Sequence, residues 1–209
     1  MSMTSLMAEI ESTLAEGGQW CSPERAHTLA AIVCANRPRQ IVEIGVWMGG
    51  SAIPMLCALR HVARHTGGAG QLLAIDPWSP AASIEGQTDA NRAWWGNQDH
   101  ERAYQAFCAR LHKHEVTEFC RIERVKSDDA AVPPSIDLLS IDGNHGEQAI
   151  RDVRRFAANV PVGGILAIDD LDWSEGAVER AHALAVTMGF LDLYPLGTGV
   201  IMRRATRGL

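Results

Sequence analysis

The sequence predicts a single α/β domain built on a doubly wound, mainly parallel β-sheet. Short apolar runs that end at glycine or aspartate alternate with longer segments whose apolar side chains recur every three or four residues. The chain has 209 residues, of which 46% are hydrophobic, and this is enough for one domain with a substantial core. Because no repeat or low-complexity linker divides the chain, one domain is expected to span residues 1–209.

Residues 1–37 are expected to form two helices. Residues 4–15 and 23–35 carry apolar side chains at helical spacing, and the second helix begins with Ser22 as N-cap and Pro23 at the first helical position. These helices are expected to cover either the active site or a partner subunit, which leaves a homo-oligomer as an open alternative.

Strands and helices alternate along the rest of the chain. Apolar and β-branched runs predict strands at residues 40–45, 71–76, 121–126, 136–141, 165–168, 190–196 and 200–204. Helical spacing predicts helices at residues 51–65, 104–112, 149–157 and 177–188. A tryptophan-rich polar stretch breaks this alternation, so residues 77–119 are expected to form an insertion, or lid, over one end of the sheet. The short turn at residues 197–199 predicts an antiparallel hairpin for the last two strands.

Composition disfavours several classes of partner. The net charge is −6 and no basic stripe is present, so nucleic acid is not an expected partner. No apolar run approaches the ~20 residues that cross a bilayer, and no basic segment precedes an apolar one at the N-terminus, so a cytoplasmic location away from membranes is predicted. The five cysteines include no C-x-x-C pair, which is typical of reduced structural thiols.

A glycine-rich turn follows the first predicted strand, in the sequence EIGVWMGGS at residues 43–51. Glycines such as Gly45 and Gly49 let the backbone approach a ligand, and the helix that begins at Ser51 offers free N–H groups. The spacing matches neither G-x-G-x-x-G nor a P-loop, which disfavours both. Glu43 is placed to accept a hydrogen bond from an ammonium group, and Trp47 is expected to pack near the ligand. A tight turn without a ligand is the alternative.

The ends of the next two strands carry further candidates for ligand binding, because ligands of such sheets bind beyond the carboxyl ends of the strands. Asp76 is placed to accept both hydroxyls of a ribose, unless it only opens a turn before the proline that follows. Trp78 is placed to cover an adenine. Ser127 and Asp128 follow the third strand, where adenine would lie, although they also fit an ordinary loop.

Together these motifs resemble class I S-adenosylmethionine (SAM)-dependent methyltransferases, with E-x-G-x-x-x-G-G-S for the methionine end of SAM and Asp76 for its ribose. The runs IDGNH (141–145) and GGILAIDD (163–170) are similar to the I-D-G-x-H and G-G-x4-D-D motifs of a small-molecule O-methyltransferase family related to catechol-type and macrolide-sugar enzymes. The resemblance spans roughly residues 40–204. It implies a Rossmann-like fold, SAM as cofactor and a small-molecule acceptor, either a natural product or a sugar.

The matching acidic positions of that family hold a divalent metal, which implies Asp142, Asp169 and Asp170 as ligands. These carboxylates follow two adjacent strands, where their repulsion would be costly without a cation. Oxygen ligands favour Mg²⁺, or alternatively Mn²⁺, over zinc. Asp142 is also expected to contact the cofactor and to take part in catalysis. Taken singly, the three are also typical of helix caps and turns.

His145 is the predicted general base, because it lies three residues after Asp142 at the start of a helix. The other histidines considered, His61, His65, His112 and His114, are expected to be solvated. Trp94 and Trp95 are expected either to wall the acceptor site or to pack within the insertion, and Trp173 is expected to flank the acceptor.

The prediction is therefore metal-assisted methyl transfer from SAM to a hydroxyl group of a small molecule. Two alternatives remain. One is a metal-dependent hydroxylase related to the same family, and the other is a nucleotide-binding module without catalytic activity.

Overall fold

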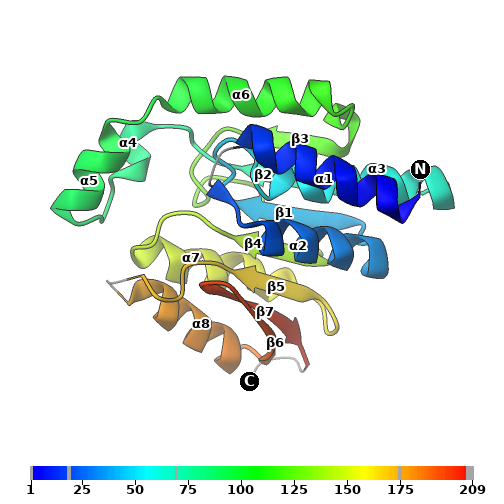
Figure 1. Ribbon diagram of the computed structural model, residues 1–209. Coiled ribbons are helices and arrows are strands. Elements are labelled where there is room, and N and C mark those ends of the chain that lie inside the picture. The colour runs from blue at the N-terminus through cyan, green and yellow to red at the C-terminus, as the bar shows by residue number, and fades with distance from the viewer. Residues whose placement is uncertain (1, 18–19, 69, 174–175, 206–209) are drawn as a thin grey trace.

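The computed structural model describes residues 2–17, 20–68, 70–173 and 176–205, and its centre is a seven-stranded sheet (Figure 1). The strands are β1 (Gln40–Ile44), β2 (Gln71–Ile75), β3 (Cys120–Glu123), β4 (Leu138–Ile141), β5 (Ile165–Ile168), β6 (Phe190–Leu196) and β7 (Gly199–Arg204). Their order across the sheet is β3-β2-β1-β4-β5-β7-β6. The strands from β1 to β5 are parallel, whereas β7 is antiparallel to both β5 and β6. The predicted α/β fold with a C-terminal hairpin is confirmed.

Helices cover both faces of this sheet (Figure 1). They are α1 (Met3–Gly17), α2 (Pro23–Asn36), α3 (Ala52–Thr66), α4 (Pro80–Ser83), α5 (Asp89–Gly96), α6 (His100–Lys113), α7 (Glu147–Phe156) and α8 (Ala177–Thr187), with short 3₁₀ turns at Thr117–Phe119 and Ala157–Asn159. The predicted cap of α2 is confirmed, since Ser22 Oγ accepts a hydrogen bond from the Arg25 amide.

Two apolar cores result, because successive residues of a strand point to opposite faces of the sheet. Ile41 and Leu72 pack with α1, α2, α3 and α6 on one face. Val42 and Leu73 pack with α7 and α8 on the other face. Burial on both faces explains why these strands are continuously apolar.

The segment that was expected to be an insertion divides into two parts. Helix α6 buries Phe107 and Leu111 in the first core and connects β2 to its parallel neighbour β3, so it is a regular crossover helix. Only α4 and α5 lie outside the alternation of strands and helices (Figure 1). The sequence pattern predicts that this helix begins at residue 104, whereas α6 begins at His100. The difference arises because the first turn of α6 is strongly polar and gives little apolar periodicity.

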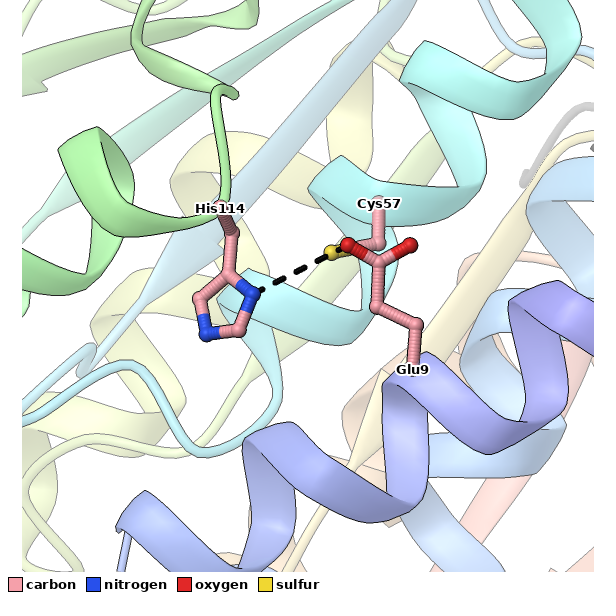
Figure 2. Close-up of side chains that lie close together, drawn as sticks. All are labelled: Glu9, Cys57 and His114. Atoms are coloured by element: carbon pink, nitrogen blue, oxygen red, sulfur yellow. Dashed lines mark ion pairs between the residues drawn. The ribbon is translucent and has the colours of Figure 1, made fainter.

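The N-terminal helices pack against α3, and a buried ion network fastens α1 there. Both Glu9 carboxylate oxygens accept hydrogen bonds from Arg60, at 2.5 and 2.6 Å. His114 Nδ1 lies 3.8 Å from Glu9 Oε1, and Figure 2 shows this pair. His114 Nε2 lies 2.9 Å from Glu16 Oε2, and the histidine is buried, so the expectation that it is solvated was wrong. Its partners come from α1, about 100 positions earlier in the chain, and local spacing could not reveal them.

Cys57 lies beside Glu9 and His114, and the three could be mistaken for a metal site (Figure 2). Burial raises the pKa of the Cys57 thiol to about 12, and Arg60 already supplies positive charge to Glu9. We therefore assign this cluster a structural role. All five cysteines are free thiols.

Among the described helices, none combines the length and the apolar character that crossing a membrane would require.

Candidate active site

The ends of four parallel strands lie side by side at one edge of the sheet. The Gly45 amide donates to the Ile75 carbonyl at 2.9 Å, and the Asp142 amide donates to the Ile44 carbonyl at 2.8 Å. The Asp169 amide likewise donates to the Ile141 carbonyl at 3.1 Å. The parallel register therefore brings together residues that are widely separated in the sequence.

A cavity of about 710 Å³ opens at this edge, within the usual range for a small-molecule site. Most of the predicted site residues line it: Gly45, Trp47, Ser51, Asp76, Ser127, Asp142, His145, Asp169 and Asp170. The structure thus joins the glycine turn and the acidic motifs in a single cavity.

Asp76 holds the glycine turn in place. Its Oδ2 accepts hydrogen bonds from the amides of Val46 and Trp47, at 3.0 and 2.9 Å, and its Oδ1 accepts one from the Trp78 amide at 2.7 Å. Burial raises the pKa of Asp76, although these hydrogen bonds oppose the shift. Gly45 is required in this turn, because its φ is +84° and a Cβ there would lie 2.1 Å from the Asp142 carbonyl oxygen.

Glu43 is fully buried below the turn, where its Oε1 accepts a 2.5 Å hydrogen bond from Ser51 Oγ. Its Oε2 is buried without a hydrogen-bond partner among the described residues. Burial raises the pKa of Glu43 to about 7. An unpaired carboxylate oxygen next to a cavity-lining serine fits an ammonium ligand.

The raised pKa of Glu43 predicts a pH-dependent stability. The folded protein keeps this proton up to about pH 7, whereas the unfolded chain releases it near the ordinary value of 4.5, so the free energy of unfolding falls as the pH rises between these values. Glu43→Gln should remove roughly 3 kcal/mol of that fall. Denaturant unfolding from pH 4.5 to 8 measures it, with Glu118→Gln on the surface as control. Parallel curves for Glu43→Gln and the wild type would contradict the assignment.

Four predicted site residues do not line the cavity: Glu43, Gly49, Trp78 and Asp128. Gly49 packs on α6, where a Cβ would lie 2.5 Å from the Phe107 ring. Trp78 adopts a left-handed φ of +41°, and its ring packs in the core against Tyr104 and Phe107. Asp128 faces solvent beside Arg151.

At the other end of the cavity, His145 and Asp170 form a pair. His145 Nε2 lies 2.8 Å from Asp170 Oδ2, and this contact lowers the pKa of Asp170. The imidazole stacks on Trp173 with ring centroids 4.0 Å apart, and its Nδ1 has no hydrogen-bond partner among the described residues. Asp170 has a φ of +53°, a costly conformation for a residue other than glycine, and this conformation aims its carboxylate at His145.

Arg25 was not anticipated at this site. It comes from α2 and is 2% exposed, with Nε 3.3 Å from Asp169 Oδ2 and Nη2 3.6 Å from Asp142 Oδ2. Nη2 also donates to Ser140 Oγ at 3.1 Å. The guanidinium therefore supplies part of the positive charge that the carboxylates require. Burial nevertheless raises the pKa of Asp142 well above its usual range, with Arg25 opposing the shift.

The predicted metal ligands are consequently separated into two groups. Ligand atoms of Asp142, His145 and Asp170 lie within 4.8 Å of one another, which fits a divalent ion. Asp169 does not belong to that group, and its Oδ2 faces Arg25 instead. The donors that converge are thus two carboxylates, which suit Mg²⁺ and Mn²⁺, and an imidazole, which is a ligand more typical of softer transition metals.

Sequence reasoning also missed a polar group that lines the cavity near β3. Ser127 Oγ donates to Asp152 Oδ1 at 2.6 Å, and Gln148 Nε2 donates to the same oxygen at 2.9 Å. Asp152 Oδ2 is buried without a hydrogen-bond partner among the described residues, and burial raises the pKa of Asp152 to about 6. The spacing of Gln148 and Asp152, one turn apart on α7, could have indicated them.

Solved structures of other proteins share this fold. NovP, an O-methyltransferase, is 19% identical, with a TM-score of 0.69 over 88% of this chain and 81% of its own. The Streptomyces achromogenes O-methyltransferase TomG, solved with SAM, is 14% identical, with a TM-score of 0.63 over 96% and 89% of the two chains. A Bacillus cereus O-methyltransferase solved with S-adenosylhomocysteine (SAH) is 15% identical, with a TM-score of 0.66 over 99% and 93%. At these identities the likeness establishes the fold alone.

Sequence comparison gives two further results. No curated protein matches the chain significantly. The family model for a methyltransferase domain matches residues 42–171, which are more than half of the chain and include the glycine turn, Asp76, Asp142 and both motif aspartates. The chain therefore belongs to this family of methyltransferase domains.

Proposed function

We propose that the protein transfers a methyl group from SAM to a hydroxyl group of a small molecule. The observation that carries this proposal is the single cavity in which the glycine turn and Asp76 face the His145–Asp170 pair. Membership of the methyltransferase family supports it, and so do structural neighbours described as O-methyltransferases, one of them solved with SAM.

The proposed cofactor position follows from the polar groups that line the cavity or lie directly below it. Glu43 Oε2 would accept the ammonium group of SAM, and Asp76 would accept its ribose hydroxyls with the lone pairs that the turn amides leave free. Ser127 and Asp152 would meet the adenine. Both Glu43 and Asp152 carry a buried oxygen without a hydrogen-bond partner in the described part of the chain, which fits a ligand that donates hydrogen bonds at each end.

Replacing Asp76 by alanine should weaken the binding of SAH by about 10- to 100-fold, because the turn loses the acceptor of three amides and the ribose loses a charged partner. Isothermal titration calorimetry measures the affinity. Asp128→Ala is the matched control, since Asp128 lies outside the cavity lining, and it should bind SAH as the wild type does. Equal affinities for Asp76→Ala and the control would refute the ribose assignment.

At the acceptor end, His145 is proposed as the general base. Asp170 engages Nε2, so Nδ1 is the nitrogen left to take a proton from the acceptor hydroxyl. Trp173 stacks on the ring and holds its orientation. When bound, SAM supplies an electrophilic methyl group on a sulfonium. The remaining task of the protein is to hold the acceptor oxygen in line with that methyl group and to exclude water.

We further propose that Asp142 and Asp170 hold a divalent cation, Mg²⁺ or Mn²⁺, while Asp169 pairs with Arg25 beside them. When bound, such a cation acts as a Lewis acid that lowers the pKa of an acceptor hydroxyl. The two carboxylates fit this role, because their oxygen atoms already converge.

Chelation tests the metal. Dialysis against EDTA is expected to abolish methylation while SAH binding persists, because the acidic group lies at the acceptor end of the cavity, and added Mg²⁺ or Mn²⁺ should restore turnover. Mass spectrometry of the methylated product measures the activity. Full activity in EDTA would rule out the metal and leave methyl transfer itself untouched.

A further inference from the structure

Five of the six tryptophans in the chain line the same cavity: Trp20, Trp47, Trp94, Trp95 and Trp173. Trp173 lies against His145, whereas the other four contact one another and form what we call the tryptophan wall (Trp20, Trp47, Trp94 and Trp95). The sixth, Trp78, is buried beneath the glycine turn and supports it by donating to the Trp47 carbonyl at 2.8 Å.

The tryptophan wall is assembled from three separate parts of the chain. Trp20 precedes α2, Trp47 belongs to the glycine turn, and Trp94 and Trp95 lie on α5. The Trp20 ring centroid lies 5.6 Å from that of Trp47 and 5.4 Å from that of Trp94, and the Trp47 and Trp95 centroids are 5.4 Å apart. These separations are those of edge-to-face and tilted aromatic contacts. The wall is thus a tertiary feature that joins the N-terminal helices to α5 across the cavity.

The wall is left unusually exposed. Trp20 is 40% exposed and Trp94 is 47% exposed, although both line the cavity. Aromatic side chains gain much of their stabilising effect from burial, so exposed indoles grouped around a cavity indicate a surface that a ligand covers. The indole N–H groups of Trp47 and Trp173 are buried without a hydrogen-bond partner among the described residues, and they add two donors for oxygen atoms of a ligand.

The wall also has a defined place relative to the reacting groups. Asn144, next to His145, donates to the Glu85 carbonyl at 2.9 Å, so the segment that carries α5 is attached to the loop of the proposed base. Cys21, the residue after Trp20, packs against the glycine turn. A Cβ added at Gly50 would lie only 2.8 Å from the Cβ of Cys21. This contact places Trp20 beside the turn. The wall therefore lines the same cavity as His145, and the segments that carry it contact both the glycine turn and the loop of the proposed base.

From this arrangement we propose that the methyl acceptor is a planar aromatic molecule with a hydroxyl group, a phenol, which lies against the tryptophan wall with its hydroxyl toward His145. The proposal rests on the proposed function. Indole rings attract other aromatic rings in offset or edge-to-face geometry. The charged groups of the cavity gather at Asp142 and Asp170, where a single reacting hydroxyl would lie. A sugar would present several hydroxyls to the wall, and the wall offers them few donors and no acceptor side chains.

Binding to the SAH complex tests the acceptor class directly. The probes are quercetin and protocatechuate as phenols and methyl rhamnoside as a sugar, and tryptophan fluorescence reports binding. Quercetin and protocatechuate should bind and the rhamnoside should not. Trp94→Leu and Trp20→Leu should each weaken quercetin binding by about tenfold, because they keep an apolar side chain and remove the ring. Tyr194→Leu is the matched control, since Tyr194 is an aromatic residue of similar exposure, 48%, that does not line the cavity.

Preferential binding of the rhamnoside, or equal quercetin affinity in all three variants and the wild type, would overturn the proposal. Two other measurements separate this failure from failure of the proposed function. Calorimetry with SAH tests the cofactor site alone, and mass spectrometry detects methylation of either probe class. Methylation of the rhamnoside and of neither phenol would uphold methyl transfer and overturn the aromatic acceptor.

Discussion

Replacing His145 by glutamine is expected to lower kcat by about 100- to 10,000-fold, the usual contribution of a general base, while SAH binds with unchanged affinity. The structure gives the reason. His145 is the imidazole paired with Asp170 at 2.8 Å, and its other nitrogen has no hydrogen-bond partner in the described part of the chain. Glutamine keeps a polar side chain of similar reach and cannot take up the proton.

The dependence of kcat on pH gives a second test of His145 as the base. The dependence of kcat on pH that a general base imposes on the wild type should be absent from His145→Gln. Asp170→Asn is also expected to lower kcat, because Asp170 pairs with His145 and is a proposed ligand of the cation. His112→Gln is the control, because His112 is exposed on α6 and should leave both kcat and the profile unchanged. If His145→Gln retains full activity with an unaltered profile, His145 is not the base.

Replacing Arg25 by methionine is expected to lower the free energy of unfolding by about 3–5 kcal/mol, which is typical when one partner of a buried ion pair is removed. Arg25 is 2% exposed and faces both Asp142 and Asp169, so methionine fills the space and leaves the two carboxylates without their cation. Urea denaturation at pH 7 measures the change. Arg64→Met is the matched control, because Arg64 makes only an exposed ion pair with Glu115 and should cost at most about 1 kcal/mol.

A second substitution tests the cause of this loss. Adding Asp169→Asn to Arg25→Met should restore part of the stability, because it removes one uncompensated negative charge. Mg²⁺ should also stabilise Arg25→Met more than it stabilises the wild type, since an ion would then replace the missing charge. Equal stabilities for Arg25→Met and the surface control would show that Arg25 does not balance the carboxylates.

Much of the site could be predicted from the sequence because its motifs are local. The glycine turn and Asp76 each follow a strand of a parallel sheet, and all such strands end at one edge. The same rule predicted that Asp142 and His145 would meet Asp170, which follows the neighbouring strand. These expectations needed only the order of the strands and the residues after each of them.

Other features of the site depend on a backbone angle or on a distant segment. Trp78 follows Asp76 closely, but its left-handed φ directs the ring into the core, and no spacing rule reports that angle. Asp169 is a predicted metal ligand, and no sequence pattern indicates that Arg25, more than 140 positions away, lies against it. Asp152 and Gln148 line the cavity because α7 turns that face toward β3, which depends on how the helix packs.

The sequence alone thus determined the α/β fold, the edge of the sheet at which the candidate site residues gather and the family to which the motifs belong, because apolar periodicity and strand-end motifs involve neighbours in the chain. Only the tertiary structure decided which charge lies against the aspartates, that His145 pairs with Asp170 and that four tryptophans share one wall. Those properties depend on contacts between helices that are far apart in the sequence, and the packing of side chains, rather than their spacing, sets such contacts.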